Sequence, residues 1–116
     1  MRVSYIIPPM EINLLTIAHE EVSPTIQALF DITKPTMPRA FQVLEGLNKG
    51  QILVDDLERP SKAVVRDGMY GTLYFGGEVN APLIASLVQS FRQIGEVGIG
   101  CWLDDPLNEL IPKNFD

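Results

Sequence analysis

The chain has 116 residues, 46% of them hydrophobic and 21% charged, and its 15 acidic and 9 basic side chains give a net charge of −6. This length and composition are typical of one globular domain. The basic residues are scattered singly, which disfavours nucleic acid and anionic membranes as partners, because phosphate binding requires several Lys or Arg side chains on one face. No apolar run approaches the ~18 residues of a membrane span.

Cys101 is the single cysteine of the chain. It excludes an intramolecular disulfide and a cysteine-based zinc site. The apolar stretch between Arg2 and Pro8 is too short for a secretory signal. We therefore expect a cytoplasmic location and no metal site.

The first part of the chain carries two predicted helices. A short strand is expected over Val3–Ile7, and Ile12–Ala18 is compatible with either helix or strand. Ser23 in a capping position, followed by Pro24, predicts the start of the first helix. Its apolar face carries Ile26, Leu29 and Phe30.

A second helix is predicted over Thr36–Glu45, with Thr36 as its cap and Gly46 just past its end. Its apolar face carries Met37, Ala40, Phe41 and Leu44. From Gln51 the period changes to that of strands. Short connections join three β-prone runs and predict an antiparallel meander. The runs are Ile52–Val54, Ala63–Val65 and Thr72–Phe75.

The clearest predicted element is an amphipathic helix that begins after the cap Asn80 and ends at Gly95. Its apolar stripe consists of Leu83, Ile84, Leu87, Val88, Phe91 and Ile94. A strand over Gly98–Trp102 follows, and the right-handed crossover rule places it parallel to Leu73–Phe75. Cys101 and Trp102 are expected to be buried, and Pro106–Leu110 is expected to start a short last helix. The prediction is an α+β fold: two N-terminal helices, a three-stranded antiparallel meander, an amphipathic helix and a further parallel strand.

Three segments and the end of the third strand carry a family resemblance. They read PRAFQVLEG over 38–46, GQILVDD over 50–56, PSKAVV over 60–65 and YFGG over 74–77. They resemble the N-terminal region of GNAT-type acetyltransferases of the zwittermicin A resistance-like family. The resemblance implies that residues 1–116 form a single domain equivalent to the N-terminal half of such an enzyme, with a partial GNAT-like mixed sheet. The family's acetyl-CoA site would lie mostly in a following half.

Anion binding at the start of a helix requires free backbone N–H groups and a positive helix dipole. In the GNAT family this site is marked by R/Q-x-x-G-x-G/A between a strand and a helix. Gly76–Ala81 lies at that topological position, and Gly76, Gly77, Asn80 and Ala81 are the candidate cofactor-binding residues. A tight strand-to-helix turn is the competing interpretation, because Glu78 adds negative charge and Asn80 uses one donor as a cap. Arg92–Gly98 nearly matches the motif, but it ends a helix, where carbonyl groups repel phosphate.

The remaining polar residues do not identify a catalytic group. His19 stands beside Glu20 and Glu21, yet adjacent side chains of a helix do not face each other, so a surface histidine is the favoured interpretation. Two carboxylate pairs could bind magnesium if they converged, and as turn-forming residues they have a simpler explanation. These pairs are Asp55–Asp56 and Asp104–Asp105.

Three hypotheses follow from the sequence. The first is the N-terminal scaffold domain of a GNAT-like N-acetyltransferase, without the acetyl-CoA pyrophosphate loop and partnered by a C-terminal GNAT half. The second is a free-standing, non-catalytic binding or dimerisation module that pairs with a second copy through an open sheet edge. The third is direct binding of acetyl-CoA through Gly76–Ala81. Under the first two, acetyl-CoA is not expected to bind this chain tightly.

Overall fold

The computed structural model describes residues 14–101 and 105–111. Helices and a mixed five-stranded sheet make up an α+β fold, as the sequence predicts. In chain order the elements are β1 Leu15–Ile17, the 3₁₀ turn η3 His19–Glu21, α1 Pro24–Gln27, α2 Met37–Leu44, β2 Gly50–Val54, β3 Lys62–Asp67, β4 Thr72–Gly77, α3 Ala81–Arg92, β5 Gly98–Ile99 and the 3₁₀ turn η4 Pro106–Leu110.

The strands lie in the sheet in their order along the chain, β1-β2-β3-β4-β5. The first four are antiparallel neighbours, and β5 pairs with β4 in parallel after the crossover through α3. The predicted meander and parallel strand are therefore confirmed. The segment Ile12–Ala18, whose sequence is compatible with either helix or strand, contains the additional edge strand β1. The antiparallel part therefore has four strands instead of three.

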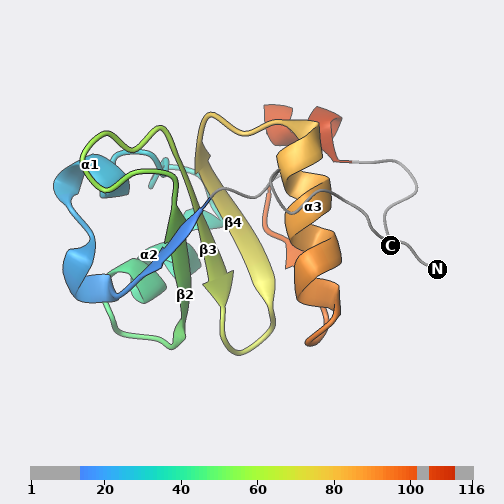
Figure 1. The fold of residues 1–116 in the computed structure, drawn as a ribbon, viewed down its shortest axis with the longest axis horizontal. Coiled ribbons are helices and arrows are strands. Elements are labelled where there is room, and N and C mark those ends of the chain that lie inside the picture. Colours follow the sequence, from blue (N-terminus) through green and yellow to red (C-terminus); the bar gives the residue numbers. More distant parts are fainter. Residues whose placement is uncertain (1–13, 102–104, 112–116) are drawn as a thin grey trace.

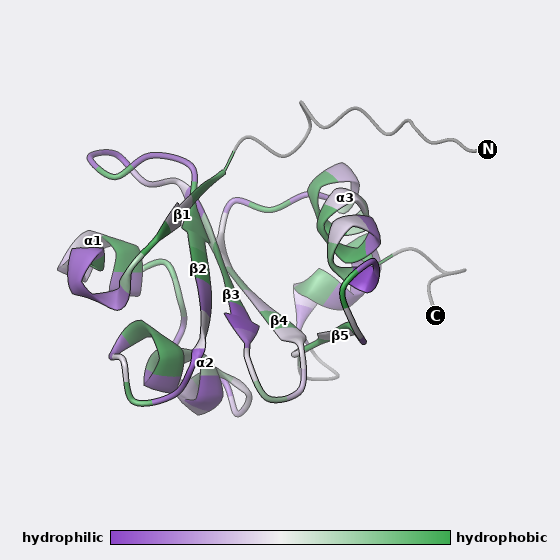
Figure 2. Cartoon of the chain, turned by 60° about the horizontal axis from the view of Figure 1, so that its bottom comes forward, coloured by the Kyte–Doolittle hydropathy of each residue, from purple (hydrophilic) through white to green (hydrophobic). Residues whose placement is uncertain are grey.

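Helices cover both faces of the sheet (Figure 1). The two α-helices of the N-terminal part lie on one face, and α3 lies on the other, as the second view also shows (Figure 2). Alternate residues of the central strands therefore enter two separate apolar cores. Val65 joins the core under α1 and α2, while its neighbour Val64 joins the core under α3, and both are fully buried. This two-sided burial explains the continuous apolar runs of β2 and β3.

The helix signals of the sequence are confirmed in part. Ser23 Oγ accepts a hydrogen bond from the N–H of Ile26, and Asn80 Oδ1 accepts one from Leu83, so both predicted caps form. Thr36 precedes α2 as predicted, but its hydroxyl makes no capping bond and is buried without a partner. Gly46 has a φ of 79°, the left-handed conformation expected after the end of a helix.

Three expectations differ from the structure. Helix α1 ends at Gln27, so Leu29 and Phe30 follow the helix instead of lying on it. Helix α3 ends at Arg92, and Ile94 lies beyond it and is 67% exposed, so the apolar stripe of the helix ends with Phe91. The last predicted strand, Gly98–Trp102, is shorter in the structure: β5 comprises Gly98–Ile99, and Gly100 and Cys101 follow it outside the strand. The predictions for Val3–Ile7 and for Trp102 lie outside the described residues.

Candidate functional site

Strands β4 and β5 separate soon after they meet. Their register has two pairs, Thr72 with Gly98 and Leu73 with Ile99. The N–H of Gly100 still donates to the carbonyl of Leu73 at 2.8 Å. Beyond this bond β4 continues to Gly77, while the described chain of β5 has already ended. Among residues 14–101 and 105–111, the outer edge of β4 is therefore open only at Phe75, between the backbone bonds made at Leu73 and at Gly77.

Phe75 lies on this open edge. Gly77 donates its N–H to the carbonyl of Leu29 at 3.0 Å, and Glu78 donates to Ser61 at 2.8 Å. Because hydrogen bonds of an antiparallel ladder alternate, the N–H of Phe75 points away from β3, as that of Gly77 does. No backbone partner for this N–H occurs within 14–101 or 105–111. The backbone of Phe75 is thus available to an extended ligand.

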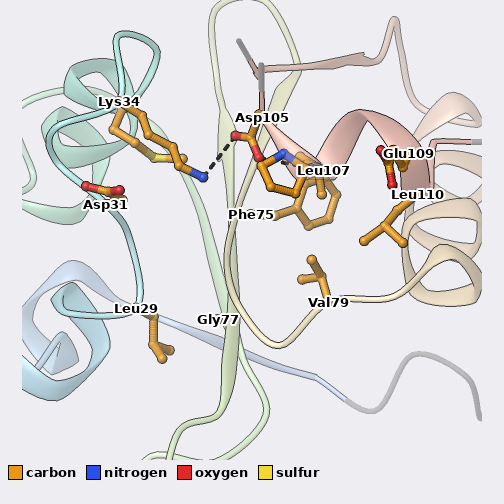
Figure 3. A pocket seen from close by; sticks show the side chains of 12 residues that line it. Leu29, Asp31, Lys34, Phe75, Gly77, Val79, Asp105, Leu107, Glu109 and Leu110 are labelled. Atoms are coloured by element: carbon orange, nitrogen blue, oxygen red, sulfur yellow. Dashed lines mark hydrogen bonds and ion pairs between the residues drawn. The ribbon is translucent and has the colours of Figure 1, made fainter. Parts of the chain in front are cut away.

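A cavity of about 600 Å³ adjoins this edge. Figure 3 shows it between the segment after α1, which carries Asp31 and Lys34, and η4, which carries Leu107 and Leu110. Its apolar lining consists of Leu29, Met37, Phe75, Val79, Pro106, Leu107 and Leu110. Its charged lining consists of Asp31, Lys34, Asp105 and Glu109. The size and the largely apolar wall are those of a small-molecule site.

An ion pair crosses the cavity. Lys34 Nζ lies 3.0 Å from Asp105 Oδ2, and the two side chains are 35% and 7% exposed (Figure 3). The other carboxylate oxygen of Asp105 accepts the N–H of Leu107 at 2.9 Å, which caps η4. Asp31 accepts hydrogen bonds from the hydroxyl and the N–H of Thr33, which lower the pKa of its carboxyl group. With Glu109, the lining has three acids and one lysine, so its electrostatics disfavour a polyanion.

The candidate cofactor-binding loop Gly76–Ala81 borders the cavity through Gly77 and Val79. Two of its donors are engaged, because the N–H groups of Gly77 and Glu78 bond to carbonyls, and the side chain of Asn80 accepts the N–H of Leu83 in the first turn of α3. Gly76 is buried, and a Cβ there would lie 2.8 Å from the carbonyl oxygen of Leu29. These contacts favour the turn interpretation over an anion site.

The second glycine motif, Arg92–Gly98, begins at the last residue of α3. Its first residues cap the end of the helix, with the N–H of Ile94 donating to the carbonyl of Phe91. The prediction that this motif closes a helix is confirmed. Carbonyl groups and the negative end of the helix dipole point toward it, which is unfavourable for phosphate.

His19 and the pair Asp55–Asp56 make local contacts, and Asp104 of the second carboxylate pair lies outside the described residues. His19 is 47% exposed on its side chain, lies 3.4 Å from Glu20 and packs its ring against Gly46, beside a second cavity of about 670 Å³. Asp55 and Asp56 bond the backbone of their own loop, as the turn interpretation predicts. No group of three potential metal ligands occurs in the described part of the chain.

Cys101 is half-buried near the cavity, and its thiol donates to Asn108 Oδ1 at 3.3 Å. Burial raises the pKa of this thiol, and Asp105 raises it further, against the opposing effect of Lys34. A protonated thiol is a poor nucleophile at neutral pH. Burial likewise raises the pKa of Tyr74.

The sequence reasoning missed the most prominent charged contact of the site. Lys34 and Asp105 stand 71 positions apart in the chain, and no local pattern links them. The apolar residues of η4 were the one feature of the sequence that pointed to this site. A predicted short helix that carries Leu107 and Leu110 must bury its apolar side against a neighbouring element. None of the helices within the described ranges is long and apolar enough to cross a membrane.

Comparison with models of known protein families, with curated proteins and with solved structures found no match to this chain.

Proposed function

We propose that this chain is the N-terminal scaffold half of a GNAT-like N-acetyltransferase that acts in the cytoplasm. The observation that carries the proposal is the open edge of β4 at Phe75, next to a cavity of about 600 Å³. The order of elements agrees with the order that the family resemblance implies. In this proposal the edge holds the amide-bearing arm of an acyl thioester, and a C-terminal half completes the site.

The chemistry of the edge suits such an arm. An extended ligand with amide groups adds to an exposed strand through backbone hydrogen bonds. The free N–H of Phe75 faces the position of such a ligand. The apolar side chains of Leu29, Val79 and Leu107 would surround a thioester and its methylene groups.

The phosphates of acetyl-CoA gain little from this chain. The N–H groups of Gly77 and Glu78 already bond to carbonyls, and Asn80 Oδ1 accepts the N–H of Leu83 in the first turn of α3. Asp31 and Glu109 add negative charge near the same opening. We therefore expect weak binding of acetyl-CoA, and the loop Gly76–Ala81 contributes shape but no anion site.

A nuclear magnetic resonance titration tests the proposal. Acetyl-pantetheine, which lacks the nucleotide, and acetyl-CoA are added separately to ¹⁵N-labelled protein. We expect both to shift the amide signals of Phe75, Gly77 and Val79, with millimolar dissociation constants that agree within about threefold, because the acidic lining of the cavity is unfavourable for the phosphates. Val79→Lys, which places a long side chain in the opening, abolishes the shifts. The control Leu47→Lys, at a 71% exposed position outside the cavity lining, leaves them unchanged.

Two outcomes would contradict this. Binding of acetyl-CoA about ten or more times tighter than acetyl-pantetheine would mean that Gly76–Ala81 binds phosphate, which is the third hypothesis. Unchanged signals at the β4 edge with both ligands would remove the basis of the scaffold proposal. The chain by itself is expected to transfer no acetyl group.

The alternative is a non-catalytic dimerisation module. The open edge of β1 favours it, because Leu15 there is 51% exposed. A dimer in light scattering that Leu15→Lys converts to a monomer would support this alternative. A monomer at all concentrations would count against it.

A further inference from the structure

Two turns lie side by side at the end of the sheet opposite the cavity. One joins β3 to β4, and the other joins α3 to β5; both are at the bottom of Figure 1. The N–H of Gly98 donates to the carbonyl of Gly71 at 3.5 Å, and a Cβ at Gly71 would lie 2.3 Å from the carbonyl oxygen of Glu96. Three large apolar side chains project from these turns: Met69 is 75%, Tyr70 61% and Ile94 67% exposed.

Arg66 lies between the same two turns. Its guanidinium carbon is 5.0 Å from the centre of the Phe91 ring. Its Nη2 lies 3.4 Å from the position that a Cβ would take at Gly71 and 3.7 Å from the corresponding position at Gly95. Strand, helix and both turns thus hold the guanidinium in place. We call Arg66, Met69, Tyr70 and Ile94 the turn patch.

Arg66 has no acidic partner among the residues that the structure describes. Its Nε is buried and makes no hydrogen bond, and the described carboxylates form no ion pair with it. Three other cations of the chain do pair with an acid, namely Lys34, Arg39 and Lys62. A buried donor without a partner destabilises the fold. The held, partly buried guanidinium is therefore suited to a carboxylate from outside the described chain.

A second cation stands at the patch. The guanidinium carbon of Arg39 lies 5.3 Å from the centre of the Tyr70 ring, and its Nη1 lies 3.3 Å from the buried carboxylate of Asp67. Asp67 in turn accepts the N–H of Met69 at 2.7 Å, which fixes the turn. Aromatic, methionine and arginine side chains are the residues enriched at protein–protein interfaces. The turn patch combines all three.

We propose that the turn patch binds an acidic peptide segment of a partner protein, with one carboxylate on Arg66 and apolar side chains on Met69, Tyr70 and Ile94. A guanidinium binds a carboxylate through two parallel hydrogen bonds. The exposed apolar side chains extend beyond the reach of a small anion, which favours a peptide. The patch is remote from the cavity, so the inference does not depend on acetyl transfer.

Fluorescence anisotropy tests the inference with a labelled peptide that has a central aspartate flanked on each side by two leucines. A second peptide has asparagine at the centre. We expect the aspartate peptide to bind at least about tenfold tighter than the asparagine peptide, because the ionised carboxylate receives the stronger hydrogen bonds. Arg66→Gln removes this difference. Ile94→Ser, at an exposed position, weakens both peptides without changing their ratio.

Arg59→Gln is the matched control, since it removes one positive charge from an exposed position on another loop, and it leaves binding unchanged. Thermal unfolding of each variant checks that the fold is intact; Ile94→Ser keeps the test valid if Arg66→Gln unfolds. Equal binding of the two peptides by the native chain would overturn the inference. So would equal losses in Arg59→Gln and Arg66→Gln, or full displacement of the peptide by inorganic phosphate at millimolar concentration, which would indicate a small-anion site.

Discussion

Strand β4 has two neighbours that hold it unequally. With β3 it forms five register pairs, from Lys62–Gly77 to Arg66–Leu73, and with β5 it forms two. Strand pairing therefore extends along the length of β4 on the side of β3 and is short on the side of β5. The contrast indicates that stability is concentrated in the meander, while the proposed ligand edge lies where the ladder ends.

The residues of the two neighbours explain the contrast. Strand β3 is filled by Ala63, Val64 and Val65, each with no exposed surface, because helices cover both of its faces. Strand β5 is two residues long and is followed by Gly100, where a Cβ would lie 2.3 Å from the ring of Tyr74. The ring thus packs on the backbone where the chain leaves β4, and the glycine permits this close approach.

The largest expected effect compares two paired positions, Leu73 and Ile99. Leu73 has no exposed surface and Ile99 is half-buried. We expect Leu73→Ala to lower the free energy of unfolding by about 3 kcal/mol and Ile99→Ala by about 1 kcal/mol, because a fully enclosed cavity costs more than a surface hollow. Urea unfolding measures both. Equal losses would show that β5 is as integral to the fold as β4.

Glycines at the two borders of β4 give the next comparison. Gly77 has a φ of 82°, and a Cβ there would lie 2.2 Å from the carbonyl oxygen of Ser61. Gly77→Ala is expected to cost about 2 kcal/mol of unfolding free energy, because the backbone must shift. Gly98→Ala is the control on the β5 side, where the nearest atom is Thr72 Oγ1 at 3.7 Å. It should change stability by less than about 0.5 kcal/mol. A larger loss at Gly98 would contradict the looser packing of β5.

The loop between β2 and β3 supplies a pH-dependent test of the meander. Burial by itself raises the pKa of Asp55, but hydrogen bonds from Ser61 and Lys62 outweigh it and lower the pKa below its usual value of 3.8. A lowered pKa in the folded state adds stability above the unfolded pKa, and this contribution disappears as the pH falls through the folded pKa.

Asp55→Asn should therefore lower the free energy of unfolding by about 1–2 kcal/mol at pH 7, from the loss of hydrogen bonds to a charged group. As the pH falls below the lowered pKa of Asp55, native and variant proteins should approach equal stability, because the native carboxyl is then protonated. Chemical unfolding across this range measures the difference. Asp56→Asn, in the same loop, is the comparison. A loss at Asp55 that does not change with pH would exclude the ionic contribution.

The part of the fold that the sequence predicted well has local signals. Asn80 and Pro82 mark the start of α3, and the apolar spacing from Leu83 to Phe91 defines its buried face. The prediction was wrong for Ile94, since periodicity continues in the sequence after the helix has ended. Strand β1 was left undecided because it has three residues and buries one of them, Ile17.

The candidate site was less accessible to sequence reasoning. Gly77 and Asn80 were found because glycine and capping residues have local conformational preferences. Whether the N–H groups of Gly77 and Glu78 remain free depends on the carbonyls of Leu29 and Ser61, which come from distant loops. The cavity is likewise closed by η4 and the segment after α1, and no short pattern encodes that long-range approach.

The smallest expected effect concerns the ion pair between Lys34 and Asp105, which links these two segments on the open side of β4. Lys34 is 35% exposed, so Lys34→Met should change the global unfolding free energy by no more than about 0.5 kcal/mol. The local effect should be larger, since the pair connects η4 to the segment after α1. The N–H of Leu107 donates a hydrogen bond to Asp105, and its hydrogen-exchange rate should rise about threefold in Lys34→Met. Lys49→Met, at an exposed position, is the matched control. An unchanged exchange rate of the Leu107 N–H in Lys34→Met would mean that apolar packing alone holds η4 beside the cavity. The segment next to β5 would then be stabilised by apolar burial, as the meander is.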